Sequence, residues 1–166
     1  MRALIAFPLL FLVAILQSAL VSRLPLLSGH ADLMLVILAS WAAQPRVTHA
    51  WEWAFLGALL IAFLSAFPWP LIFLTYLATT SIALALRKVI RSPLLTLILA
   101  LFLGTILSGI TGWAYLFLIQ SALPFSTIFS EVTSPSLLLN LVLALVAIPL
   151  INRLASWVYP GEEENE

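Results

Sequence analysis

The stretch of sequence that decides the fold covers residues 93–123 and reads PLLTLILALFLGTILSGITGWAYLFLIQSAL. It contains no charged residue, and about 20 apolar residues in a helix are enough to cross the hydrocarbon core of a bilayer. The proline at its start is a favoured first residue of a helix. The stretch therefore predicts a transmembrane helix that is longer than one crossing requires.

The composition of the whole chain is also that of a membrane protein. Hydrophobic residues make up 63% of the 166 residues and charged residues 8%, whereas a soluble domain carries about 25% charged residues. Lipid must therefore solvate much of the surface. The net charge of zero gives no basic field for nucleic acid, and the absence of cysteine excludes disulfides and thiolate chemistry. We predict an all-α polytopic integral membrane protein.

Five further apolar runs predict helices, and together with the first stretch they give about six transmembrane helices. The runs cover residues 3–22, 32–43, 51–67, 71–86 and 136–158. The run at 32–43 is the shortest. The first run is longer than the apolar part of a signal peptide, which is about 7–15 residues, so we interpret it as a helix that stays in the protein. Residues 1–160 then form a single transmembrane domain, followed by an acidic cytoplasmic tail at 161–166.

The distribution of basic residues predicts the orientation. With six helices and a cytoplasmic N-terminus, only Arg23 lies in an outside segment. The inside segments hold Arg2, Arg46, Arg87, Lys88, Arg91 and Arg153. This asymmetry is the positive-inside pattern, and it is lost if the second helix is omitted. Both termini are expected in the cytoplasm. Tryptophans are expected at the membrane interfaces, with Trp41, Trp51, Trp53 and Trp157 near the inner face and Trp69 near the outer face.

Few ionisable residues lie within the predicted helices. Asp32 and Glu52 each stand at the start of a helix, where an acid caps free backbone N–H groups and meets the positive end of the dipole. A functional ion pair or proton site is the alternative for both, and Asp32 is also placed to pair with Arg23. The sequence has no motif of a known catalytic or phosphate-binding site, and its two histidines lie in different loops. We therefore predict no enzyme activity, cofactor or metal.

Small and polar residues mark the faces where helices meet. Gly104, Ser108 and Gly112 share one face of the predicted helix at 93–123 and favour close approach of a second helix, either within the chain or in a partner. Pro149 is expected to kink the last helix. Other polar residues are expected to hydrogen-bond between helices or to line a small-molecule pocket: Gln17, Ser18, Thr75, Tyr76, Thr79, Thr80, Ser81, Asn140 and Asn152.

Residues 116–134 form a predominantly apolar segment on the predicted outer side, with Glu131 as the only charge. Exposed apolar surface of this kind marks an interaction site or a segment that lies in the membrane surface. Phe125, Ile128 and Phe129 are the candidate docking residues for a periplasmic or bitopic partner. Two alternatives stay open, namely a long tilted helix and a segment lying flat among the lipid headgroups.

Several stretches in order along the chain carry a resemblance to a known family. They are Leu16-Gln17-Ser18, Asp32-Leu33, the run AFLGALL at 54–60, the basic turn Arg87-Lys88, and the closing segments 135–140 and 149–154. Over its whole length the chain resembles the MreD family of bacterial rod shape-determining proteins. It departs from the family in having Ala31 where a proline is usual, and Ile61-Ala62-Phe63 where the family often has an aspartate.

The resemblance implies a non-enzymatic scaffold in the bacterial inner membrane. In that family the protein pairs with the bitopic protein MreC and is thereby linked to the MreB filament, a RodA-type glycosyltransferase and a class B penicillin-binding protein, in support of lateral peptidoglycan synthesis and cell shape. The resemblance also implies a fold similar to the substrate-binding component of energy-coupling-factor transporters. An alternative function is therefore a substrate-capturing subunit of a vitamin transporter, although the first helix lacks the Ala-x-x-x-Ala repeat of such subunits.

Overall fold

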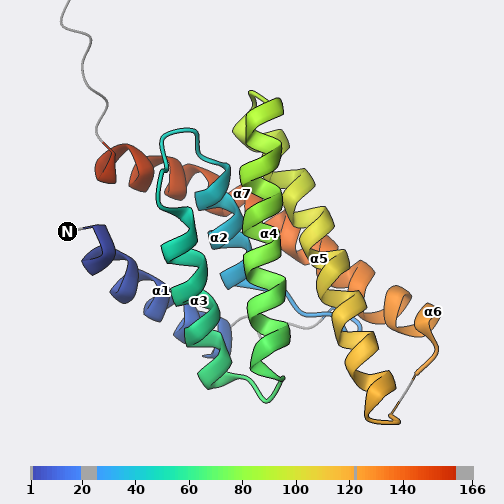
Figure 1. Ribbon diagram of the computed structural model, residues 1–166. Coiled ribbons are helices and arrows are strands. Elements are labelled where there is room, and N and C mark those ends of the chain that lie inside the picture. The colour runs from blue at the N-terminus through green and yellow to red at the C-terminus, as the bar shows by residue number, and fades with distance from the viewer. Residues whose placement is uncertain (1, 20–25, 122, 160–166) are drawn as a thin grey trace, which may run out of the picture.

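The computed structural model describes residues 2–19, 26–121 and 123–159, and within these ranges the chain is helical and has no β-strand. The prediction of an all-α fold is confirmed (Figure 1). Arg23 and the predicted tail at 161–166 lie outside the described residues. The helices are α1 (Arg2–Ala19), α2 (Leu33–Ala43), α3 (Ala50–Leu64), α4 (Trp69–Val89), α5 (Pro93–Leu118), α6 (Phe125–Ile128) and α7 (Ser134–Val158), with a π-helical turn η2 (Phe129–Thr133) between α6 and α7.

Three helical segments are long and apolar enough to cross a membrane, which supports the membrane character expected from the sequence. They are α4, α5 and the continuous run Phe125–Val158. The other apolar helices are shorter, at Ala6–Ala19, Leu33–Ala43 and Ala50–Leu64. With 11 residues, α2 is about 16 Å long at 1.5 Å per residue, which is about half the thickness of a bilayer core.

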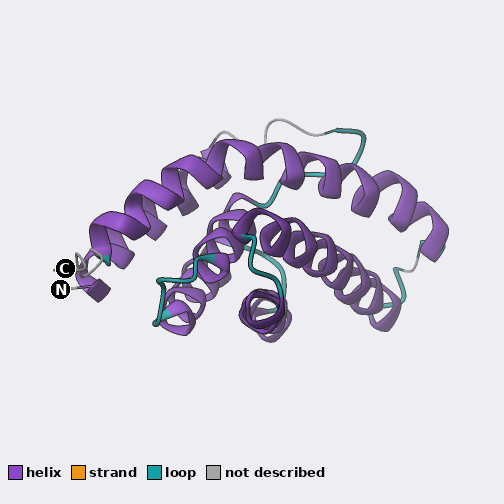
Figure 2. Ribbon diagram, turned by 90° about the horizontal axis from the view of Figure 1, so that it is seen from above, coloured by secondary structure: helices purple, strands orange, loops and turns teal. Residues whose placement is uncertain are grey.

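The short helix α2 lies at the centre of the molecule. It packs against α1, α3, α4, α5 and α7, and every residue of α2 after Leu33 is buried. Figure 2 shows α7 as a long curved helix along one side of the bundle, with Pro149 inside its span. Because protein surrounds α2, its backbone is shielded from the surroundings of the molecule.

Side chains satisfy both ends of α2, one from the residue that precedes it and one from α4. At its start, the Asp32 carboxylate accepts a hydrogen bond from the backbone N of Leu35 at 2.9 Å, as the capping prediction expected. Beyond its end, Arg87 of α4 donates to three backbone carbonyls, those of Ala42 (3.2 Å), Gln44 (2.9 Å) and Val47 (2.8 Å). A helix terminus leaves such carbonyls without partners, so Arg87 takes the place of water there.

The central position of α2 explains why two tryptophans are buried. The rings of Trp41 in α2 and Trp53 in α3, both expected near the inner membrane interface, stack with centroids 4.1 Å apart and are buried within the protein, and their depth in a membrane stays a prediction. Trp51, Trp69 and Trp157 are exposed, as interfacial residues require. The pattern of tryptophans alone does not distinguish these groups, since a helix packed on all sides buries its tryptophan wherever it lies along the axis.

The segment 116–134 contains a turn between two helices. Helix α5 ends at Leu118, earlier than the expected 123, and Gln120 follows with a φ of 59°. The chain becomes helical again at Phe125 and stays helical through η2 to Val158. The last helix was expected to begin at residue 136, so the structure extends it by more than two turns toward its N-terminus.

Candidate functional site

A network of hydrogen bonds at the start of α2 joins four helices. The backbone N of Asp32 donates to Oδ1 of Asn140 in α7 at 2.7 Å, and Nδ2 of Asn140 donates to Oγ1 of Thr105 in α5 at 2.9 Å. From α4, the Tyr76 hydroxyl donates to the two carboxylate oxygens of Asp32 at 3.1 and 2.9 Å. Asp32 and Asn140 are therefore the centre of the packing between α2, α4, α5 and α7.

Helix α1 and the loop before α2 join the same network. Oε1 of Gln17 accepts from the backbone N of Met34 at 2.8 Å, and the backbone N of His30 donates to Oγ of Ser136 at 3.0 Å. Gly29 lies against the backbone of α7 and the turn before it, and a Cβ added there would be 2.7 Å from the Val132 carbonyl oxygen and 2.8 Å from the Ser136 nitrogen. The loop can approach α7 this closely because residue 29 has no side chain.

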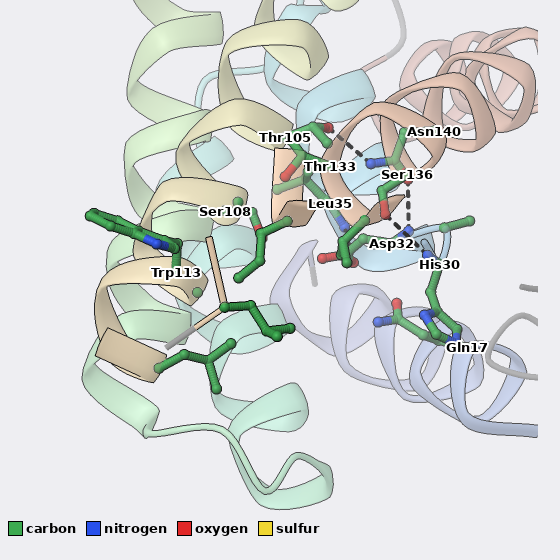
Figure 3. A pocket seen from close by; sticks show the side chains of 17 residues that line it. Gln17, His30, Asp32, Leu35, Thr105, Ser108, Trp113, Thr133, Ser136 and Asn140 are labelled. Carbon is green, nitrogen blue, oxygen red and sulfur yellow. Dashed lines mark hydrogen bonds between the residues drawn. The ribbon is translucent and has the colours of Figure 1, made fainter. Parts of the chain in front are cut away.

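Two neighbouring cavities lie beside this network. The larger has a volume of about 380 Å³ and is drawn in Figure 3, and the second has about 300 Å³. Asp32 lines both, together with Gln17, Ser108 and Gly112. The polar side of the larger cavity also includes His30, Thr105, Thr133, Ser136 and Asn140, and its apolar side includes Trp113, Leu116, Leu123 and Ile128. Of the polar residues that sequence analysis assigned to interhelical bonds or to a pocket, Gln17, Tyr76 and Asn140 therefore serve both purposes.

The two acids considered in the sequence have different surroundings. Glu52 contacts His49, the residue that precedes α3, at 3.0 Å, and both side chains are at least half exposed. An exposed pair of this kind contributes little to stability. Asp32 is only partly exposed, and no ion pair to it occurs among the described residues. Its expected partner Arg23 lies outside those residues, so that pairing stays a prediction.

The three small residues of α5 separate into two environments. A Cβ added at Gly104 would collide with Oγ1 of Thr79, a buried residue of α4. The expected close approach of a second helix is thus present there. At Gly112 an added Cβ would meet no atom within 4 Å, which corrects the expectation of tight packing. Ser108 and Gly112 line the cavities instead. Gly109, which sequence analysis did not single out, packs against Thr133 of η2.

The three candidate docking residues differ in how far they are exposed. Phe125 and Phe129 are each 45% exposed, as a docking surface requires, but Ile128 is 5% exposed and lines the larger cavity. The expectation of Ile128 as an exposed docking residue is corrected, because its side chain is buried at the cavity while the two phenylalanines keep almost half of their surface exposed. The ring of Phe125 contacts Trp113 edge-on at 5.4 Å.

Of the remaining polar residues that were expected to hydrogen-bond between helices, only some do so. Oδ1 of Asn152 in α7 accepts from Nε2 of Gln44 at 2.6 Å, as expected. Thr79 and Ser81 instead donate to carbonyls of their own helix, at 2.7 and 2.6 Å. Thr80 is buried, and its hydroxyl has no hydrogen-bond partner within the described part of the chain.

The site is suited to holding a ligand. It presents a carboxylate, an amide and several hydroxyls on one side and a tryptophan on the other. The described residues contain no group of three His, Cys, Asp or Glu side chains able to hold a metal ion. Sequence analysis named Gln17, Asp32, Tyr76 and Asn140 separately, but it gave no signal that they meet.

Comparisons with known proteins add no assignment. No family model matches the sequence, and no curated protein and no solved structure matches it. The resemblance to the MreD family therefore rests on the residues named in the sequence.

Proposed function

We propose that this chain is a non-enzymatic membrane subunit of the bacterial rod complex, in the inner membrane. It would pair with an MreC-like bitopic protein and through it serve the MreB filament, a RodA-type glycosyltransferase and a class B penicillin-binding protein. Its contribution to lateral peptidoglycan synthesis and cell shape would be that of a scaffold.

One observation carries this proposal. Three of the stretches that resemble the MreD family supply Gln17, Asp32 and Asn140, and these residues meet in one network although Asp32 and Asn140 are 108 positions apart. Their hydrogen bonds hold α1, α2 and α7 together. Residues that fix the arrangement of a fold are those that a family of scaffolds needs in common, so their meeting supports the resemblance.

The proposal includes six membrane crossings with both termini in the cytoplasm, in a fold similar to that of the energy-coupling-factor substrate-binding components. Three crossings would be made by the long helices and three by the shorter apolar helices. The shortest, α2, is wrapped by other helices, and Asp32 and Arg87 close its ends. This arrangement removes the objection that 11 residues are too few to cross lipid.

The partner would dock on the exposed phenylalanines of α6 and η2. We expect single cysteines at Phe125 and Phe129 to cross-link to the MreC-like protein of the same organism, since the chain has no native cysteine to interfere. Ile128→Cys is the matched control, because that side chain faces the cavity and is 5% exposed. Partner-dependent products at exposed α1 positions such as Phe11, with none at 125 and 129, would place the docking surface elsewhere.

A second candidate function is capture of a small substrate for a vitamin transporter of the energy-coupling-factor type. The cavity of about 380 Å³ beside Asp32 favours it, since ligand sites have volumes of about 300–1,000 Å³. Affinity purification of the full chain from its native membrane distinguishes the two functions. A bitopic periplasmic protein supports the rod complex, and an ATPase module supports the transporter.

A further inference from the structure

The Asp32 carboxylate has hydrogen-bond donors around it but no positive charge among the described residues. Within this part of the chain its oxygens accept from the Tyr76 hydroxyl at 3.1 and 2.9 Å and from the backbone N of Leu35 at 2.9 Å. These donors are a phenol hydroxyl and a backbone amide, which are neutral groups, so they leave the carboxylate without a counter-ion in this part of the chain. An ionised group shielded from water is costly unless it is paired, and such groups at membrane depth usually mark a functional site.

The cavity into which Asp32 opens has two chemically different sides. The end of the cavity where Asp32 lies also holds Gln17, His30, Ser136 and Asn140. Trp113 lies across the cavity from Asp32, as Figure 3 shows. The face of an indole ring attracts cations and also packs well on apolar groups. A ligand that fills the cavity would therefore meet a negative charge at one end and an aromatic and aliphatic wall at the other.

The donor set limits which cation can neutralise Asp32. A divalent metal needs several carboxylate, imidazole or thiolate ligands, and no group of three such side chains exists among the described residues. An organic ammonium group needs only hydrogen-bond acceptors and one negative charge, and Asp32 and the side-chain oxygens that line the cavity supply these. Its apolar substituent would lie against Trp113 and Leu116.

We propose that the cavity between α2, α5 and α7 binds an ammonium group carried on an apolar body, with Asp32 as the counter-ion and Trp113 against the apolar part. The ammonium group comes either from the headgroup of phosphatidylethanolamine or from a free amine. The proposal does not rest on membership of the rod complex, because it concerns binding by the chain alone.

The first test measures binding to the full chain in nanodiscs of phosphatidylglycerol. Calorimetric titration compares phenethylammonium with 2-phenylethanol, a neutral molecule of similar shape. We expect the amine to bind and the alcohol to bind at least about tenfold more weakly, since a paired charge is lost. Asp32→Asn should weaken amine binding by about thirtyfold or more while the protein stays folded, because asparagine caps a helix as well as aspartate does.

Two further variants locate the site. Gly112→Leu places a side chain into open space that both cavities share, so it should abolish amine binding without loss of folded protein. Glu131→Gln removes an exposed carboxylate from the nearby turn η2, so it should bind the amine as the wild type does. Wild-type affinity in Asp32→Asn or in Gly112→Leu would overturn the proposal.

A measurement in nanodiscs that contain phosphatidylethanolamine identifies the source of the ammonium group. If the source is the lipid, replacing half of the phosphatidylglycerol by phosphatidylethanolamine raises the unfolding temperature of the wild type but not of Asp32→Asn. Phosphatidylethanolamine then also competes with phenethylammonium for the cavity. If the source is a free amine, that lipid has no such effect and phenethylammonium still binds. Arg23 is the remaining competitor for Asp32. If the wild type binds neither phenethylammonium nor phosphatidylethanolamine but Arg23→Gln binds the amine, then Arg23 is the counter-ion of Asp32 and the proposal is overturned.

Discussion

Two glycines of α5, about two helical turns apart, have opposite structural reasons to be small. At Gly104 the Thr79 side chain occupies the space that a Cβ needs, and Thr79 is held by a hydrogen bond of 2.7 Å to the Thr75 carbonyl. At Gly112 the space is empty to 4 Å. The same residue type therefore serves helix packing in one place and cavity volume in the other.

This contrast gives a prediction about stability. Gly112→Ala should raise the free energy of unfolding by about 0.5–1 kcal/mol, because alanine has the higher helix propensity and meets no clash. Gly104→Ala should lower it by about 1–3 kcal/mol, because Thr79 must move. Unfolding of the two variants in the same detergent, side by side with the wild type, measures both changes. Equal effects at the two positions would show that the two glycines have the same surroundings in solution.

Tyr76 is the only side chain of α4 that donates to Asp32 among the described residues. We expect Tyr76→Phe to lower the free energy of unfolding by about 1–3 kcal/mol, because a buried hydrogen bond to a charged acceptor is lost while the ring stays in place. The matched control is Tyr115→Phe. Tyr115 packs its ring edge-on against Phe67, and its hydroxyl shows no hydrogen bond in the described part of the chain. A loss in the control as large as in Tyr76→Phe would contradict this account.

At the scale of the element, α2 depends on residues that lie outside it. Arg87 donates to the carbonyls of Ala42, Gln44 and Val47 and thereby closes the end of α2 and the loop that follows. Sequence analysis assigned Arg87 to the inside positive charges and to the basic turn with Lys88, without a partner in α2. A basic residue at a helix end in a membrane protein can both set orientation and satisfy backbone carbonyls, and the second function depends on tertiary structure.

A substitution series at Arg87 tests this element. Arg87→Ala should lower the free energy of unfolding by about 2 kcal/mol or more, since three carbonyls lose a charged donor. Arg87→Lys should have an intermediate effect, because a lysine keeps the charge but lacks the planar array of donors. Lys88→Ala removes a neighbouring exposed charge and should change stability by less than about 0.5 kcal/mol. Equal losses at 87 and 88 would indicate that charge alone matters.

At the scale of the whole molecule, the distribution of basic residues predicts a topology that can be measured. Reporter fusions after Arg91 and after Glu166 should both give a cytoplasmic signal, because six crossings place all basic residues except Arg23 on the inner side. A fusion within the turn at 119–121 should give a periplasmic signal. A periplasmic signal from either of the first two fusions would rule out the six-helix topology.

Sequence reasoning located the helices well and the site poorly, for physical reasons. Arg87 and Lys88 bound one apolar run and Pro93 begins the next. These are local signals, so the end of α4 and the start of α5 lie close to their expected positions. The contact between Asp32 and Asn140 depends on how α2 and α7 pack, and no local pattern encodes it. Ile128 and Phe129 are equally apolar, and only the direction of each side chain decides which faces the cavity.

The central position of α2 has a consequence for the order of synthesis. A ribosome makes α2 before α4, α5 and α7, yet those later helices supply Arg87, Tyr76 and Asn140, which satisfy its ends. With its 11 residues, the nascent helix is too short to be stable alone in lipid. With the proposed six crossings, α2 would reach its final surroundings only after α7 has been made. Chains halted before residue 134 should accordingly remain sensitive to protease in the loops around α2, whereas full-length chains should resist it.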